Sequence, residues 1–206
     1  MQPLVRAKSF DVGMRTDLIP RVETSLTFFR LDLDSELVFS GDAGSTEPSR
    51  PTRRTGFELA NFYKATDRVT FDADLAYSRG RFTDFDPVGN HIPGAIEGVV
   101  SAGVTFDRCG NFFGALRLRY FGPRPLIEDD SAHSHSSGLL NARLGYHLAN
   151  GLDLSLDVFN LLDREVSDVD YFYASRLPGE PAAGVDDVHL HPAEPRTARL
   201  TAAWRF

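Results

Sequence analysis

The stretch VTFDADLAY, residues 69–77, alternates apolar and polar side chains along most of its length. Its odd positions are all apolar, whereas its even positions include Thr70, Asp72 and Asp74. Successive side chains of a β-strand point to opposite faces, so a period of two gives the strand one apolar face and one charged face. The stretch therefore predicts a strand that lies between an apolar environment and a polar one.

The same alternation recurs in four further stretches of the chain. They cover residues 100–107, 116–120, 140–148 and 152–158. With their flanks the runs last roughly ten to twelve residues, whereas strands of soluble proteins have about five or six. A tilted strand needs roughly nine to eleven residues to cross a bilayer. The length of the runs therefore favours membrane-spanning strands over those of a soluble sandwich.

The connections between these runs alternate between short and long. Short turns are expected at residues 16–21, 65–68, 107–111 and 149–151, and long polar segments at 34–53, 80–96, 122–137 and 163–195. Asn150-Gly151 is a strong hairpin signal, because both residue types tolerate positive φ. Outer-membrane barrels combine short periplasmic turns with long extracellular loops. The sequence therefore predicts an all-β fold, an antiparallel transmembrane β-barrel segment built on this plan.

About nine long strands follow from this map. They are expected to begin near Leu4, Val22, Arg54, Arg68, Glu97, Asn111, Gly138, Gly151 and Arg196. In the second strand the pair Phe28-Phe29 shifts the apolar register, which predicts a bulge. The aromatic residues near strand ends are Tyr77, Phe106, Phe112, Tyr120, Tyr146 and Trp204. Such positions are typical of the girdles in which aromatic rings lie at headgroup level.

The composition agrees with a folded membrane protein and excludes other classes. Of 206 residues, 42% are hydrophobic and the net charge is −7, which excludes disorder and argues against nucleic acid as a partner. No stretch approaches about eighteen uninterrupted apolar residues, so no transmembrane helix is expected. Cys109 is the only cysteine, which rules out a disulfide within the chain and a Cys-based zinc site.

The last eleven residues, RTARLTAAWRF, form an amphipathic strand that stops on Phe206. Ala198, Leu200, Ala202, Trp204 and Phe206 occupy one face of this strand. A terminal Phe in phase with such a face resembles the signal that the outer-membrane assembly machinery recognises. Trp204 and Phe206 are therefore the expected assembly signal, and the machinery is an expected partner.

Almost the whole chain resembles the barrel of TonB-dependent receptors. The segments that carry the resemblance are AKSFDVGMR (7–15), GFEL (56–59), IPGA (92–95), RYFGPR (119–124) and LDVFNLLD (156–163). The last of these is similar to the family's penultimate strand with its Asn-Leu-hydrophobic-Asp ending. Residues 170–196 look like the family's last extracellular loop, which leads into the final strand.

This resemblance implies a 22-stranded barrel plugged by an N-terminal domain, in the outer membrane of a Gram-negative cell. It implies uptake of scarce ligands, commonly ferric siderophores or cobalamin, driven by the proton-motive force that TonB relays. Residues 1–206 match the C-terminal portion of the barrel, while the plug, the TonB box and a signal peptide are missing. We therefore expect a fragment that neither closes nor transports alone, with TonB engaged only through the missing plug.

Ligand contacts are expected in the last long loop. Tyr171, Tyr173, Arg176, His189 and His191 are the candidates, because aromatic and Arg side chains dominate recognition sites. The alternative is that they only structure the loop. The pairs His133/His135 and His189/His191 have the spacing of metal ligands, but polar loop residues are the simpler interpretation and no metal site is expected.

The charged face of the strands carries Arg117, Arg119, Arg143, Asp72, Asp74, Asp153 and Asp157. These residues either line a route for an anionic ligand or form an ion-paired barrel lining that packs against a plug. His147 and Ser155 have no oxyanion site near them in the sequence, so neither enzymatic activity nor a cofactor is expected.

Three functions are compatible with these features. The first is an energy-coupled receptor and transporter in the outer-membrane bilayer, with a small-molecule ligand such as an iron chelate. The second is a small structural or adhesive outer-membrane barrel, which would need an even strand number and an export signal of its own. The third is a nonfunctional remnant of the first. The sequence does not identify the ligand.

Overall fold

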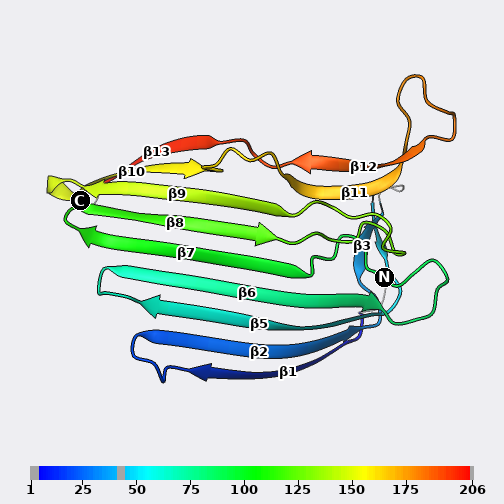
Figure 1. Ribbon diagram of the computed structural model, residues 1–206, viewed down its shortest axis with the longest axis horizontal. Coiled ribbons are helices and arrows are strands. Elements are labelled where there is room, and N and C mark those ends of the chain that lie inside the picture. Colours follow the sequence, from blue (N-terminus) through cyan, green and yellow to red (C-terminus); the bar gives the residue numbers. More distant parts are fainter. Residues whose placement is uncertain (1–4, 41–44, 205–206) are drawn as a thin grey trace.

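The chain forms one curved antiparallel sheet with two small hairpins at one end (Figure 1). The computed structural model describes residues 5–40 and 45–204. Within these residues the sheet contains nine strands, each hydrogen-bonded to the next across the sheet. In spatial order they are β1 (Ala7–Thr16), β2 (Val22–Leu33), β5 (Thr52–Lys64), β6 (Val69–Phe82), β7 (Gly98–Cys109), β8 (Phe112–Phe121), β9 (Ser137–His147), β10 (Leu152–Phe159) and β13 (Thr197–Trp204).

The expected strand map is confirmed. The eight strands after the first each begin within two residues of their expected position, and the first begins at Ala7. The strands are 8 to 14 residues long, as membrane-spanning strands require. Short turns lie at one end of the sheet and long loops at the other (Figure 1). None of the described segments is a helix long and apolar enough to cross a membrane.

Two hairpins lie within segments that the sequence predicts only as long loops. One pairs β3 (Leu37–Ser40) with β4 (Ser45–Pro48), and the other pairs β11 (Ser167–Ser175) with β12 (Val185–Pro192). The first is too short for an alternating pattern to be visible. The second has both Asp and aromatic residues on each of its faces, which hides the period of two.

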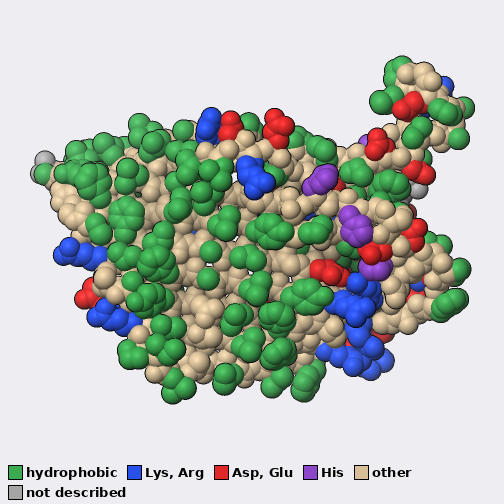
Figure 2. Space-filling model, viewed as in Figure 1, with side chains coloured by type: hydrophobic (Ala, Val, Ile, Leu, Met, Phe, Trp, Pro, Cys, Tyr) green, Lys and Arg blue, Asp and Glu red, His purple; other side chains and the backbone are tan. Residues whose placement is uncertain are grey.

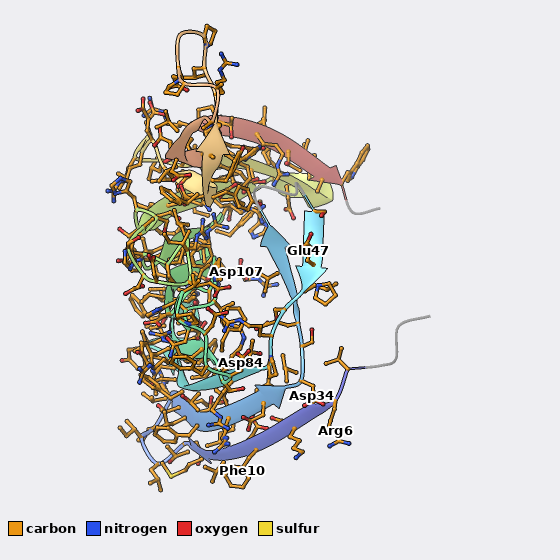
Figure 3. All side chains as sticks on the ribbon, turned by 90° about the vertical axis from the view of Figure 1, so that its right-hand side faces the viewer. Arg6, Phe10, Asp34, Glu47, Asp84 and Asp107 are labelled. Atoms are coloured by element: carbon orange, nitrogen blue, oxygen red, sulfur yellow. The ribbon has the colours of Figure 1, made fainter. Side chains whose placement is uncertain are left out.

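The sheet is bent into a trough, with the strands curving around an open side (Figure 3). Large apolar side chains stand exposed on the convex face, as Figure 2 shows. On β1 these are Phe10, Val12 and Met14, each more than half exposed. Exposed apolar side chains at every second position are expected where a barrel wall faces hydrocarbon instead of water. The concave face carries other charged residues of the sheet, among them Asp72, Arg117 and Asp157.

The predicted bulge at Phe28-Phe29 is wrong. The pairing of β2 with β1 and with β5 runs without any shift in register. Phe29 instead takes its regular place on the concave face, opposite Gly56, where an added Cβ would lie 2.8 Å from the Phe29 ring. The missing side chain of Gly56 makes room for the ring, so an aromatic residue replaces a polar one without disturbing the strand.

The buried apolar core lies at the loop end of the sheet. Phe82, Ile92 and Ala95 pack together, and Val38 of β3 packs against them. Phe82 is the last residue of β6, while Ile92 and Ala95 belong to the segment that follows it. The loops therefore have a compact core of their own, which holds them at the end of the trough.

Candidate functional site

Four segments meet at the loop end of the sheet, and we call them together the outer-loop cluster. They are the β3–β4 hairpin, residues 83–97, residues 122–136 and the β11–β12 hairpin. A cavity of about 410 Å³ lies between them. All four segments contribute to its lining, together with Glu36 just before β3 and Arg54 of β5. The residues from the four segments are Leu37, Val38, Ile92, Pro93, Gly94, Ala95, Ile96, Arg124, Leu126, Val169, Asp170, Tyr171 and Phe172. Figure 3 looks onto this end of the molecule.

A buried ion pair joins residues 122–136 to the β11–β12 hairpin. Arg124 Nη2 lies 2.9 Å from Asp170 Oδ2, and the two side chains are 10% and 4% exposed. The same nitrogen donates to the Asp168 carbonyl at 3.0 Å. Ser134 closes the base of the loop, because its N–H donates to the Arg124 carbonyl and its hydroxyl accepts from the Arg124 N–H. A buried charge requires a partner, so this pair fixes where the hairpin sits.

A second Arg, Arg50, joins two segments of the cluster to the apolar core. Arg50 contacts Asp84 at 3.2 Å, Asp86 at 3.7 Å and the carboxylate of Glu128. It also donates to the Gly89 carbonyl at 3.1 Å and lies 4.2 Å above the centre of the Phe82 ring. One guanidinium thus ties the core to residues 83–97 and 122–136. Its five donors make Arg suited to such a junction.

The carboxyl group of Glu128 titrates in an unusual environment. Burial raises its pKa above the ordinary value of 4.5, and the negative charges of Asp86 and Asp84 add to this effect. The Arg50 cation lowers the pKa of Glu128, but this one cation interacts with three carboxylates. The net direction of the pKa shift is upward, because burial is the largest influence.

The motif LDVFNLLD ends at a second junction, where the last long loop leaves the sheet. Asn160 is 3% exposed and has a φ of 48°, a left-handed conformation that Asn tolerates. Its side-chain amide donates to the carbonyls of Arg164 and Glu194, and its side-chain oxygen accepts from the Arg164 N–H. Asn160 thus ties the beginning of the loop to its end, just before β13.

Asp163 completes this junction. Its carboxylate accepts a hydrogen bond from the Arg196 N–H at 3.2 Å and pairs with the Arg196 guanidinium at the same distance. The Asp163 N–H donates back to the Asn160 carbonyl at 2.8 Å. The Asn and the Asp of the motif therefore hold the two ends of the loop together and position the start of the last strand.

Four of the five expected ligand contacts share one face of the β11–β12 hairpin. Tyr171 pairs with His189, Val169 with His191 and Tyr173 with Asp187, and cross-strand partners point to the same side. The rings of Tyr173 and His189 stack with centroids 3.9 Å apart. Arg176 is separate: it donates to the Glu180 carbonyl at 3.2 Å in the hairpin tip.

The other His pair does not assemble a metal site. His133 lies 3.0 Å from Asp130, which is also 3.5 Å from His91, whereas His135 is exposed. Among the described residues no group of three or more His, Cys, Asp or Glu side chains has a metal-binding arrangement.

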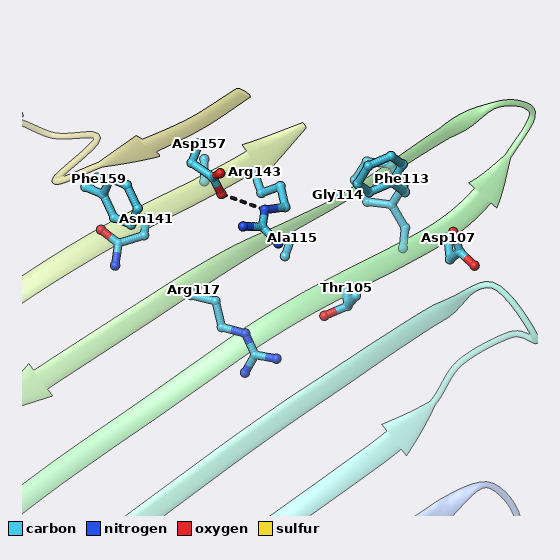
Figure 4. A pocket seen from close by; sticks show the side chains of 12 residues that line it. Thr105, Asp107, Phe113, Gly114, Ala115, Arg117, Asn141, Arg143, Asp157 and Phe159 are labelled. Atoms are coloured by element: carbon cyan, nitrogen blue, oxygen red, sulfur yellow. Dashed lines mark hydrogen bonds and ion pairs between the residues drawn. The ribbon is translucent and has the colours of Figure 1, made fainter. Parts of the chain in front are cut away.

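The concave wall is lined by ion pairs, as Figure 4 shows for Arg143 and Asp157. Arg143 lies 2.6 Å from Asp157, whose side chain is only 8% exposed, and Arg199 approaches the same carboxylate at 3.7 Å. Arg117 lies 2.5 Å from Asp72. A hollow of about 590 Å³ along this wall is lined by residues of β7, β8, β9 and β10. Of the expected inward-facing charges, Arg117 is thus paired with Asp72 and Arg143 with Asp157, while Arg119 lies 3.5 Å from Asp168 of the last long loop.

The remaining sequence-predicted residues lie away from the outer loops. His147 lies 2.7 Å from Asp153 and 3.4 Å from Asp107 at the turn end of the sheet. Trp204 lies on the convex face of β13, opposite Leu152 of β10, and is 68% exposed. Phe206 lies outside the described residues.

Sequence reasoning missed the residues that hold the outer-loop cluster together, Arg50, Arg124 and Asp170. Their partners are 34 to 78 residues away in the chain. No local pattern marks such contacts. The resemblance covered Arg124, in the RYFGPR segment, and Asp170, the first residue of the segment 170–196, but it did not indicate that the two residues are partners.

The long strands, the apolar convex face and the charged concave face define a segment of an outer-membrane β-barrel. The family model described as TonB dependent receptor-like, beta-barrel matches residues 5–161. The chain therefore belongs to the TonB-dependent receptor family, whose members are receptors and transporters of the Gram-negative outer membrane and not enzymes. The short turns are accordingly periplasmic and the long loops extracellular. A search of curated proteins by sequence finds no match.

Solved structures with the same fold include three receptors and transporters. The ferric-catecholate import receptor Fiu from Escherichia coli K12, in its closed form, has a TM-score of 0.73 at 20% identity, over 98% of this chain and 28% of that one. The ferric yersiniabactin uptake receptor FyuA from Yersinia pestis has a TM-score of 0.71 at 18% identity, over 96% of this chain and 29% of that one.

The copper transporter OprC has a TM-score of 0.72 at 18% identity, over 98% of this chain and 32% of that one. At these identities the likeness establishes the fold and not the ligand. The chain spans about 30% of the length of these proteins.

Proposed function

We propose that this chain is the C-terminal part of the barrel of an outer-membrane receptor that imports a scarce small molecule, such as a ferric siderophore, with energy relayed by TonB. The observation that carries the proposal is the outer-loop cluster, in which four extracellular segments surround one cavity above a charged lumenal wall. Loops held by a core and by buried ion pairs present a rigid surface, which reduces the entropic cost of binding a ligand.

The shared face of the β11–β12 hairpin is the proposed contact surface. Tyr171, Tyr173, His189 and His191 provide aromatic area and hydrogen-bonding tips in one patch. Tyr171 also lines the cavity between the loops, so it can contact a ligand seated there. The stacked pair of Tyr173 and His189 loses little conformational freedom when a ligand packs on it. Arg176, in the hairpin tip, is proposed to contact only larger ligands.

Uptake by the receptor in its own host tests this proposal. Cells that carry Tyr171→Ala with Tyr173→Ala are compared with wild-type cells for uptake of iron-labelled siderophores. We expect the half-saturating concentration to rise roughly 30-fold, because a central aromatic contact is worth about 2 kcal/mol. Tyr120→Ala is the matched control, because this ring lies on the lipid-facing side at the same end of the barrel.

Energy coupling separates this function from that of a structural or adhesive barrel. Uptake is expected to stop in cells that lack TonB and in cells treated with a protonophore. We also propose that TonB is engaged through a plug domain in the N-terminal part of the receptor. Transport that continues unchanged without TonB would overturn the proposed energy coupling. If no siderophore is taken up and surface adhesion depends on the chain, the adhesive alternative is correct.

A further inference from the structure

A group of basic side chains lies on the lipid-facing side of the barrel wall, near its extracellular end. Figure 2 shows it as a blue cluster on the convex face, at the loop end of the sheet. Arg53 of β5 is the cross-strand partner of Arg81 of β6, and Arg79 lies two positions along β6 on the same face. The three side chains line one shallow hollow of about 330 Å³.

The basic surface continues across the two preceding strands. Asp32 of β2 is the partner of both Arg53 and Lys8, and Arg30 lies two positions before it on the same face. We call Lys8, Arg30, Arg53, Arg79 and Arg81 the outer basic patch. The ion pairs found for the patch involve two carboxylates, Asp32 and Glu97. Arg6 and Asp34 lie beyond the patch, where the Asp34 N–H donates to the Arg6 carbonyl. They add one positive and one negative charge, so they leave the net charge unchanged.

The patch therefore has an excess of positive charge. Asp32 accepts from Arg30 at 2.8 Å and from Arg53 at 2.6 Å, so one carboxylate orients two guanidinium groups and neutralises only one of them. Within the part of the chain that the structure describes, no ion pair involves Lys8 or Arg79. Three of the five cations thus remain without a counter-charge from the protein.

The depth of the patch follows from a row of aromatic rings on the same strands. Phe28, Phe57 and Tyr77 are neighbours on the convex face, with ring centroids 6.2 Å and 6.1 Å apart. Arg30 and Arg79 lie two residues further toward the extracellular end, and Arg53 and Arg81 lie four. At about 3.4 Å per residue, the cations lie roughly 7–14 Å beyond the rings.

Aromatic girdles mark the boundary between hydrocarbon and headgroups. Cations just outside such a girdle lie at the level of the charged groups of the outer leaflet. The guanidinium group presents paired donors that match the oxygens of a phosphate. A ligand imported through the lumen does not reach this side of the wall, so the patch is separate from the transport route.

We propose that the outer basic patch binds the phosphate groups of an anionic glycolipid in the outer leaflet of the outer membrane. The acyl chains of this lipid pack along the apolar convex face below the Phe28–Phe57–Tyr77 row. The sugar phosphates lie against Arg53, Arg79 and Arg81, and Arg30 and Lys8 extend the contact toward β1. The lipid thereby anchors the extracellular rim of this part of the wall.

Lipid binding by the purified receptor tests the proposal. Lipopolysaccharide of a deep-rough strain is titrated onto the receptor in mild detergent, and the bound lipid is counted by native mass spectrometry. Arg53→Gln with Arg79→Gln is expected to weaken binding roughly 25-fold, because each cation near an anionic lipid surface changes an affinity about fivefold. Enzymatically dephosphorylated lipopolysaccharide is expected to bind the wild type as weakly as intact lipid binds this variant.

Arg68→Gln with Arg108→Gln is the matched control. It removes the same charge from exposed residues at the periplasmic turns, where no outer-leaflet lipid reaches. Unchanged binding in this control and lost binding in the patch variant support the proposal. Equal binding by all three proteins, or equal loss in both variants, would overturn it. Siderophore uptake in the patch variant is measured separately, so failure of the transport proposal does not affect the result.

Discussion

Asn160 illustrates how one side chain serves both a strand and the loop that follows it. Its left-handed backbone turns the chain out of β10, and its amide group binds both ends of the last extracellular loop. The Asn160 N–H in turn donates to the side-chain oxygen of Asn141 on β9 at 2.9 Å. A residue of this kind is required for its hydrogen bonds and its conformation, and not for contact with a ligand.

Asn160→Ala is expected to lower the free energy of unfolding by about 2–4 kcal/mol, because several buried polar groups lose their partners. The urea midpoint of the receptor in detergent measures this. Asn160→Gly separates the two causes, since Gly keeps the positive φ without the amide. The matched control is Asn61→Ala, which removes a single hydrogen bond with Thr24. If Asn160→Ala is as stable as this control, the junction does not support the loop.

The raised pKa of Glu128 predicts that the stability of the outer loops depends on pH. Its pKa is raised in the folded chain, mainly by burial, so the folded loops hold this proton more tightly than the unfolded chain does. The stabilisation is therefore full below the ordinary pKa of 4.5 and is lost as the pH rises through the raised value. In a pH series of urea midpoints, Glu128→Gln is expected to reduce this decline. A variant with the same pH profile as the wild type would contradict the assignment.

At the level of strands, the convex face of the wall requires apolar side chains and the concave face requires polar ones. Leu200 in the middle of β13 pairs with Leu156 on the convex face, whereas the adjacent Thr201 pairs with Ser155 on the concave face. The side chains of neighbouring residues therefore enter hydrocarbon and water respectively. The C-terminal strand is the part proposed to carry the assembly signal, and Trp204 lies on its lipid-facing side.

Leu200→Lys is expected to destabilise the inserted barrel by about 2–4 kcal/mol, the cost of a lipid-facing cation near the middle of the bilayer. Thr201→Lys, one position along, is expected to have little effect. The amount of heat-modifiable receptor in the outer-membrane fraction measures assembly of each variant. Equal assembly of the two variants would mean that the faces of β13 are assigned incorrectly.

The strands were predictable because their information is local. A period of two and a run of membrane length are visible in any window of the sequence, and the turns at Gly110 and Gly151 carry their own positive φ. The β3–β4 and β11–β12 hairpins were not predictable, because their stability comes from the core and the ion pairs beneath them. The failed bulge at Phe28-Phe29 has the same origin, since only the partner strand shows that Gly56 makes room for Phe29.

At the scale of the whole molecule, the outer-loop cluster depends on contacts between segments far apart in the chain. Asp170→Asn leaves the buried Arg124 without a counter-charge and is expected to cost about 3 kcal/mol. The β11–β12 hairpin should then detach, and trypsin should cleave faster at Arg176 in its exposed tip. Arg124→Met with Asp170→Leu is expected to recover much of the protection. Equal cleavage of the single and double variants would show that the pair does not hold the hairpin.

The sequence by itself determined the class of protein, the number and direction of the strands and the end of the sheet that carries the long loops. Each of these follows from side-chain periodicity and from the terminal strand, which depend only on neighbouring residues. Only the tertiary structure decided which loops meet, which cations remain unpaired on the lipid-facing side, and which candidate residues share a face. Those features depend on strand register and on buried partners such as Arg124 and Asp170, because opposite charges stabilise each other only where folding brings them together.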